Sequence, residues 1–130
     1  MTIRLPGDPP SPYELRYGYS RVLRVGDFAM VGGTTSVTRE GNVVGETPGE
    51  QTFEILRKIV RELERVGAGL GDVIQTRMYV TDISRADEVA RAHGEVFGEV
   101  RPLTTMVEVS ALIDPRMLVE IEAVAYLGEG

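Results

Sequence analysis

The sequence of 130 residues predicts one domain, residues 1–130, long enough to bury most of the surface that its unfolded chain would expose. Its net charge of −6 and pI of about 4.8 argue against nucleic-acid binding, which needs a basic patch. The absence of cysteine excludes disulfides, thiolate nucleophiles and cysteine metal sites. No apolar run is long enough for a membrane span or a signal peptide, so we expect a cytoplasmic protein without membrane contact.

The N-terminal third combines turn signals with strand-like runs. Four prolines within residues 1–12 predict an extended lead-in that is poorly ordered or lies on the surface. Residues 17–25 and 28–31 predict two strands joined by a turn, and a further hairpin is expected around Glu40-Gly41. The pair Gly32-Gly33 directly follows the second run. It either kinks the strand or lets another backbone or a ligand approach closely.

The clearest local signal is a helix that begins after Thr47. Thr47 predicts an N-cap, Pro48 suits the first helical position, and Glu50 completes a capping box. Glu54 and Lys58 are expected to pair across one turn on the outer side. An apolar stripe at helical spacing follows the cap: Phe53, Leu56, Ile59, Val60, Leu63 and Val66.

The middle of the chain predicts a strand and a second helix. Residues 72–81 alternate as a strand does, and Ser84 with Asp87 predicts the start of the helix. His93, in this helix, is the only histidine. A lone histidine without a cluster of partners cannot form a metal site, so we expect a packing or surface residue and no metal.

The last third contains two β-branched, alternating runs, residues 104–109 and 117–125. Successive side chains of a strand point to opposite faces, so Glu120 and Glu122 share one face about 7 Å apart. Glu108 joins them if the two runs pair. A strand with one solvent-exposed face accounts for the presence of Glu108 and Glu122. Glu120 is then left as the candidate functional carboxylate.

The element order predicts an α+β domain with two helices packed on one face of a mixed sheet. Two helices cannot cover all the apolar strand residues, so the other sheet face is expected to be partly apolar. Such a face on a small domain predicts oligomerisation. The residues on which this expectation depends are Met30, Val31, Val107, Val109 and Ile121.

A combined pattern of short motifs resembles the RidA/YjgF family, also called the Rid or L-PSP group, over about residues 15–127. The resemblance implies a chorismate-mutase-like α+β fold and homotrimers whose sheets form a central barrel, with a small-molecule cleft at each subunit interface. The matching stretches are Tyr19-Ser20-Arg21-Val22, Gly26-Asp27-Phe28, Gly32-Gly33, Gly71-Asp72-Val73, Tyr79-Val80-Thr81-Asp82, Arg101-Pro102 and Val119-Glu120-Ile121-Glu122-Ala123.

The same resemblance implies hydrolysis of reactive enamines and imines, such as 2-aminoacrylate, to a keto acid and ammonia, without a cofactor. Glu120 falls on the family's water-activating glutamate, Tyr19 on a cleft tyrosine and Gly33 on a close-approach glycine. The family arginine that binds the substrate carboxylate does not carry over, because its position is Thr104 here. Threonine offers one neutral hydrogen bond where arginine offers two charge-assisted ones.

Two hypotheses follow from this departure. One is a hydrolase of altered specificity, in which Thr104, Thr105 and the Gly33 backbone hold the substrate and Arg101 or Arg77 replaces the missing cation. Arg77 is otherwise expected to pair with a nearby carboxylate. The alternative is a non-catalytic trimer that binds a ligand or a protein partner in the same clefts.

Overall fold

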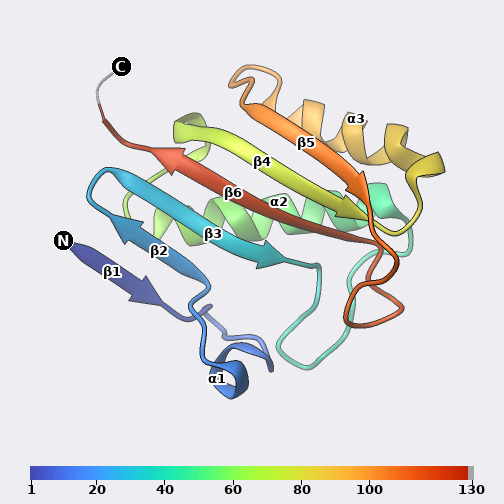
Figure 1. Cartoon of the computed structure of the whole chain (residues 1–130), viewed down its shortest axis with the longest axis horizontal. Coiled ribbons are helices and arrows are strands. Elements are labelled where there is room, and N and C mark those ends of the chain that lie inside the picture. The colour runs from blue at the N-terminus through green and yellow to red at the C-terminus, as the bar shows by residue number, and fades with distance from the viewer. Residues whose placement is uncertain (129–130) are drawn as a thin grey trace.

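The computed structural model describes residues 1–128 and contains one mixed sheet of six strands with the order β1-β2-β3-β6-β4-β5 (Figure 1). All neighbouring strands run antiparallel except β4 and β5, which are parallel. The predicted α+β class with a mixed sheet is therefore confirmed. In chain order the elements are β1 (Thr2–Leu5), α1 (Glu14–Tyr17), β2 (Val22–Val25), β3 (Phe28–Thr34), α2 (Pro48–Glu64), η1 (Leu70–Asp72), β4 (Val73–Val80), η2 (Ile83–Arg85), α3 (Ala86–Phe97), β5 (Leu103–Glu108) and β6 (Val119–Tyr126).

Helices α2 and α3 cover one face of the sheet, as predicted (Figure 1). Strand β6 alternates strictly: Val119, Ile121 and Ala123 are buried, whereas Glu120 and Glu122 point to the opposite face and are only partly buried. Ile121 and Val31 belong to the covered core, which corrects their expected place on the free face. The core residues are contributed by both helices and by the facing side of the sheet.

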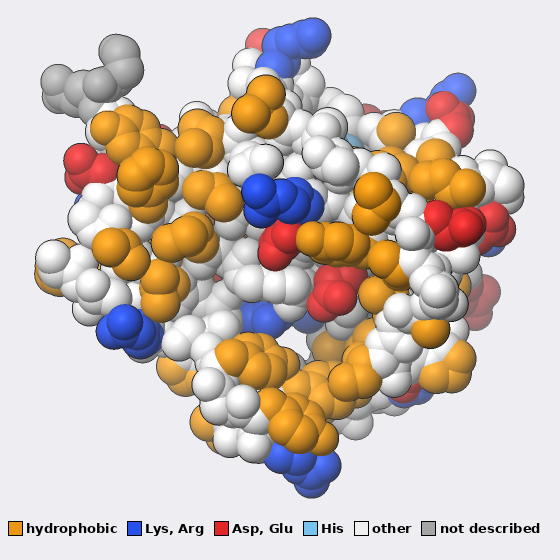
Figure 2. Space-filling view, in the orientation of Figure 1, with side chains coloured by type: hydrophobic (Ala, Val, Ile, Leu, Met, Phe, Trp, Pro, Cys, Tyr) orange, Lys and Arg blue, Asp and Glu red, His pale blue; other side chains and the backbone are white. Residues whose placement is uncertain are grey.

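The face without helices mixes apolar and charged side chains, and it is the face turned to the viewer in Figure 2. The rings of Phe28 and Tyr126 contact each other there in a tilted arrangement with centroids 5.0 Å apart, and both residues are more than one-third exposed. Val107 on β5 is 43% exposed. β5 is also an edge strand, and unpaired strand edges are sites for association. The expected partly apolar free face is therefore present in the monomer.

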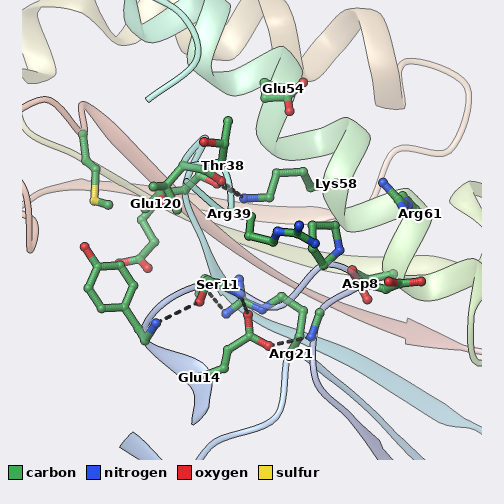
Figure 3. A pocket seen from close by; sticks show the side chains of 18 of the residues that line it. Asp8, Ser11, Glu14, Arg21, Thr38, Arg39, Glu54, Lys58, Arg61 and Glu120 are labelled. Atoms are coloured by element: carbon green, nitrogen blue, oxygen red, sulfur yellow. Dashed lines mark hydrogen bonds between the residues drawn. The ribbon is translucent and has the colours of Figure 1, made fainter. Parts of the chain in front are cut away.

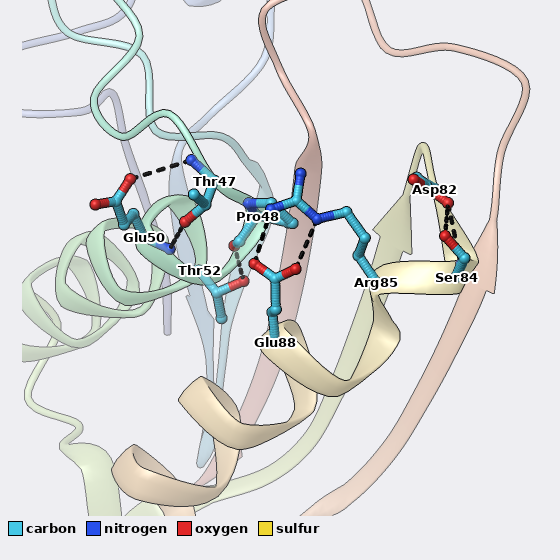
Figure 4. A network of polar contacts seen from close by, with 8 residues as sticks. All are labelled: Thr47, Pro48, Glu50, Thr52, Asp82, Ser84, Arg85 and Glu88. Carbon is cyan, nitrogen blue, oxygen red and sulfur yellow. Dashed lines mark hydrogen bonds and ion pairs between the residues drawn. The ribbon is translucent and has the colours of Figure 1, made fainter.

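Helix α2 begins as the sequence predicts (Figure 4). The Thr47 hydroxyl accepts a hydrogen bond from the Glu50 N–H at 3.1 Å, and the Glu50 carboxylate accepts one from the Thr47 N–H at 3.1 Å. The buried stripe includes Ile55, which the sequence pattern did not identify. Phe53, expected in that stripe, is 43% exposed instead.

Other local predictions are wrong because the strands pair differently in the folded sheet than their order in the sequence suggests. β4 lies between β5 and β6, so the two C-terminal runs do not pair, and Glu108 accepts a hydrogen bond from the Ile83 N–H instead of joining Glu120. The lead-in, in contrast, is extended as expected, and its residues Thr2–Leu5 pair with β2 as a partly exposed edge strand. The hairpin around Glu40-Gly41 is reduced to one bridge between Val37 and Val43.

The second helix begins one residue later than an N-cap at Ser84 predicts. Asp82 accepts hydrogen bonds from the Ser84 N–H and hydroxyl and so caps the short turn η2, and α3 starts at Ala86 (Figure 4). His93 is buried against the sheet, which agrees with the predicted packing function. Its Nε2 lies 2.8 Å from the Thr76 hydroxyl. None of the helices in residues 1–128 has the length and apolar character that crossing a membrane requires.

Candidate functional site

A cavity of about 630 Å³ lies beside Glu120, where α2, the segment around α1 and the loop after β3 meet (Figure 3). This volume is within the range of roughly 300–1,000 Å³ that small-molecule sites occupy. Three of the predicted site residues line it: Tyr19, Gly33 and Glu120. The fold thus brings together part of the site that the sequence suggested.

Glu120 reaches the cavity from the start of β6, on the face away from the helices. Burial raises the pKa of its carboxyl above the ordinary value of 4.5; the positive charge of Arg21 opposes the rise and Glu122 adds to it. A carboxyl with a raised pKa at a cavity wall can accept a proton from water and return it to a leaving group. Within this cavity, Glu120 is therefore our candidate for acid–base chemistry.

Gly33 lies directly against the Glu120 side chain. A Cβ atom added at Gly33 would be 2.7 Å from Glu120 Oε2 and 3.1 Å from its carboxyl carbon, both closer than side chains normally allow. The glycine pair lies at an irregularity of the strand, because the register between β3 and β6 shifts between Val31 and Thr34. Gly33 also allows a close approach, although the approaching group is a side chain and not another backbone or a ligand. The carboxylate can occupy this position only because residue 33 has no side chain.

Arg21, just before β2, supplies a positive charge that the sequence analysis did not select. It is only 8% exposed and donates to the Gly33 carbonyl at 2.7 Å and to the Thr34 hydroxyl at 3.3 Å. Among residues 1–128, no carboxylate lies within 4.0 Å of its guanidinium nitrogens. Its Nε atom is also buried and has no hydrogen-bond partner among residues 1–128. The only available signal was its place in the Tyr19-Ser20-Arg21-Val22 stretch.

Lys58 is the second cation that sequence reasoning missed at this site. Its amine extends from α2 into the cavity and donates to the Thr35 carbonyl at 2.5 Å and the Val37 carbonyl at 3.0 Å (Figure 3). The predicted pair between Glu54 and Lys58 is wrong, because Glu54 binds Arg57 in a two-bond ion pair. Burial lowers the pKa of the Lys58 amine from 10.5 to about 8, with the charge of Arg21 contributing.

The remaining predicted residues, Arg101, Thr104 and Thr105, do not line this cavity. Thr104 lies on the exposed edge strand β5, and its hydroxyl accepts a hydrogen bond of 2.8 Å from Thr76, which in turn contacts His93. Thr105 is its exposed neighbour on the same strand. Arg101 precedes β5 in a left-handed backbone conformation with φ of 57°. Within one chain, these residues are thus separated from Glu120.

Arg77 and Glu122 are engaged with each other on the free sheet face. The Arg77 guanidinium lies 3.8 Å from Glu122, which agrees with the expected pairing, and the Tyr79 hydroxyl donates to the same carboxylate at 2.6 Å. Arg77 does not line the cavity and so does not replace the missing cation there. Within the described residues there is no group of three or more His, Cys, Asp or Glu side chains arranged to hold a metal ion.

The fold and the site together define a small α+β domain with a ligand-sized cavity, one buried and one partly buried cation, and one carboxyl suited to acid–base chemistry. Comparison with known proteins identifies the family to which the chain belongs. The family model described as Endoribonuclease L-PSP matches residues 12–127, and the chain belongs to this family. The resemblance to the RidA/YjgF group is thereby confirmed.

Individual relatives agree over nearly the whole chain. The crystal structure of Rv2704 from Mycobacterium tuberculosis, a member of the YjgF/YER057c/UK114 family, has 45% sequence identity and a TM-score of 0.88, and covers 97% of this chain and 99% of that one. An uncharacterized protein of Streptomyces coelicolor is 37% identical over 91% of this chain and 88% of its own length. A RutC family protein of Pyrococcus abyssi is 36% identical over 83% of this chain and 85% of its own.

Proposed function

We propose that the protein hydrolyses the C=N bond of a small enamine or imine that carries a carboxylate, releasing ammonia and a carbonyl compound. The observation that supports this most directly is the Glu120 carboxyl with its raised pKa, in a cavity that also holds Arg21 without a carboxylate partner among the described residues. A buried cation without a partner favours an anionic ligand. Burial removes the water that solvates the cation, and a bound anion compensates for that loss.

The proposed reaction assigns one task to each group. Arg21 binds the substrate carboxylate, and the enamine takes up a proton at carbon to become the imine. Ionised Glu120 removes a proton from water as the water oxygen attacks the carbon of the protonated imine, and the C=N electron pair moves to nitrogen. The protonated Glu120 returns this proton to nitrogen. The hydroxyl group on carbon then loses its proton to Glu120 as the C=O bond forms, and the C–N bond breaks to release ammonia. General acid–base assistance of this kind contributes roughly 10² to 10⁴ in rate.

Position 104 supports a changed specificity. The resemblance assigns a carboxylate-binding arginine to this position, where the chain has Thr104. An acidic substrate would nevertheless meet positive charge near Glu120, because Arg21 and Lys58 line the same cavity. The substrate carboxylate would then bind at a different point of the cavity. We infer that the preferred substrate is shaped differently from a small 2-imino acid.

We further propose a homotrimer with a cleft at each subunit interface. The partly apolar sheet face and the exposed strand β5 support association. In such an assembly, Arg101, Thr104 and Thr105 of one subunit would reach the cavity of its neighbour and complete it. Their separation from Glu120 within one chain favours this arrangement over a site formed by a single chain.

The decisive assay measures ammonia release from freshly generated 2-aminoacrylate and from larger 2-imino acids. We expect the wild type to accelerate release and Glu120→Gln to lose at least about 10²-fold of that acceleration. Glu122→Gln is the matched control, since it removes the same charge from the same strand at a residue that binds Tyr79 and Arg77 outside the cavity. Arg21→Met should raise KM more than it lowers kcat.

Two outcomes would contradict the proposal. If the wild type accelerates no imine, while carboxylate ligands still bind with micromolar affinity by calorimetry, the protein is a binding module. If Glu122→Gln and Glu120→Gln lose equal activity, the cavity is not the reaction site. Cleavage of RNA is disfavoured on physical grounds, because a chain with net charge −6 repels a phosphate backbone.

A further inference from the structure

We propose that Lys58 is a covalent carbonyl-binding residue, whose amine condenses with the aldehyde or ketone group of a cavity ligand to form an imine. A 2-oxo acid is the ligand class that fits best, since Arg21 is available to bind its carboxylate in the same cavity. The choice of a 2-oxo acid rests on the proposed function, because such an acid is the product of 2-imino acid hydrolysis. The proposed reaction of the Lys58 amine with a carbonyl group does not depend on that function.

The composition of the chain makes Lys58 unusual. Of its fourteen basic Lys and Arg side chains, thirteen are arginine, and Lys58 is the only lysine in the sequence. Arginine serves as well as or better than lysine in surface ion pairs and hydrogen bonds, but its guanidinium stays protonated and cannot act as a nucleophile. The one lysine lines the one cavity that also contains Glu120.

The hydrogen bonds of Lys58 suit a neutral amine. A neutral amine has two N–H bonds and one lone pair, arranged tetrahedrally around nitrogen. The carbonyls of Thr35 and Val37 accept two hydrogen bonds from Nζ, at 2.5 and 3.0 Å, which accounts for both N–H bonds. The lone pair is then the free direction at nitrogen. Figure 3 shows the amine at the end of a side chain that runs from α2 into the cavity.

The surroundings of Lys58 favour the neutral form. Loss of water is the main cause of its lowered pKa; the positive charges of Arg21 and Arg57 act in the same direction, and Glu54 and Glu14 oppose them. No carboxylate within the described residues forms an ion pair with its amine. With a pKa of about 8, roughly a quarter of the amine is neutral at about pH 7.5, against about 0.1% for an ordinary lysine.

The chemistry balances without a further reactant. The Nζ lone pair attacks the carbonyl carbon, the C=O electron pair moves to oxygen, and a proton passes from nitrogen to that oxygen. Loss of the oxygen as water then gives the C=N bond, and the Glu120 carboxyl can supply the proton that water needs to leave. With an imine substrate the same attack expels ammonia instead of water, and hydrolysis of the lysine imine returns the free amine.

A competing explanation is that Lys58 only anchors the segment after β3 to α2 through its two hydrogen bonds. Lys58→Arg separates the two explanations, because arginine keeps the charge and the donors but cannot form an imine. Circular dichroism and the midpoint of thermal unfolding would confirm that this variant is folded. Lys58→Met, whose unbranched side chain is one atom shorter and has no donors, is the second variant.

The test is reductive trapping with pyruvate and sodium cyanoborohydride, followed by intact-mass measurement and peptide mapping. We expect one adduct on the peptide that contains Lys58 in the wild type and none there in Lys58→Arg or Lys58→Met. The trapping rate should rise with pH with a midpoint near 8. Because the sequence holds no other lysine, the N-terminal amine is the only competing amine, and mapping separates the two.

Several outcomes decide between the explanations. Labelling of the wild type at the N-terminal amine alone would overturn the proposal, as would a trapping midpoint near the ordinary lysine value of 10.5. Ammonia release without a Lys58 adduct would leave the hydrolase intact and remove the covalent site. An adduct at Lys58 in a protein that accelerates no imine hydrolysis would support the covalent site and contradict the hydrolase.

Discussion

Glu120 differs from Glu122, its neighbour on the same strand face, through its surroundings alone. Glu122 is held by Arg77 and Tyr79, whereas Glu120 is partly buried in a cavity and burial raises its pKa. A raised carboxyl pKa contributes stability that is complete below the ordinary value of 4.5 and is lost as the pH rises through the folded-state value.

The change Glu120→Gln should remove this loss of stability at higher pH, because glutamine stays neutral. We expect the free energy of unfolding of the variant, relative to the wild type, to increase as the pH rises above the ordinary carboxyl value of 4.5. Urea unfolding followed by circular dichroism at several pH values measures this difference. A difference that stays constant over the range would mean that burial does not disfavour the ionised carboxylate.

Gly33 controls the position of the Glu120 carboxylate. The change Gly33→Ala puts a methyl group within 2.7 Å of Glu120 Oε2, so the carboxylate must move. We expect the imine hydrolase activity to fall by at least about ten-fold, since small displacements of a reacting group are costly. Gly71→Ala is the matched control, because an added Cβ there meets nothing within 4 Å and should leave activity unchanged. Equal activity of the two variants would show that Gly33 does not position Glu120.

At the scale of elements, α2 depends on a cap that local sequence specifies completely. The change Thr47→Ala removes the hydroxyl that accepts from the Glu50 N–H and should lower the free energy of unfolding by about 1 kcal/mol. Thr81→Ala, a threonine between the secondary-structure elements, serves as the control. Chemical denaturation measures both variants, and an unchanged midpoint for Thr47→Ala would mean that the cap contributes nothing.

The position of β4 is an element-scale feature that local sequence does not specify. Residues 104–109 and 117–125 are consecutive strand-like runs joined by a turn, which favours a hairpin. β5 instead pairs parallel to β4, and β6 pairs antiparallel to the other edge of β4. A parallel pair needs a crossover connection, and α3 supplies it by packing back on the sheet.

At the scale of the molecule, the free sheet face predicts association. We expect light scattering to give three times the chain mass of 14.3 kDa and the midpoint of thermal unfolding to rise with protein concentration. Val107→Glu places a charge on the exposed face of β5 and should give monomers that retain the circular dichroism of the wild type. A monomeric wild type, or a trimeric variant, would contradict this assembly.

The sequence alone determined the features that depend on neighbours along the chain. The cap of α2 follows from Thr47 and Glu50, three residues apart, and the shared face of Glu120 and Glu122 follows from the two-residue period of a strand. The class of fold follows from the order of such elements. These predictions succeed because hydrogen bonding and side-chain direction within one element are set by local geometry.

Only the tertiary structure decided which side chains share the cavity. Arg21 lies just before β2, Lys58 in α2 and Glu120 in β6, and no spacing in the sequence relates them. Their chemistry also depends on burial, which removes water from Glu120 and Lys58 and shifts their pKa values toward each other. Burial is a property of the packed chain, so residues that look like ordinary surface charges in the sequence become candidate reactive groups only when the chain is folded.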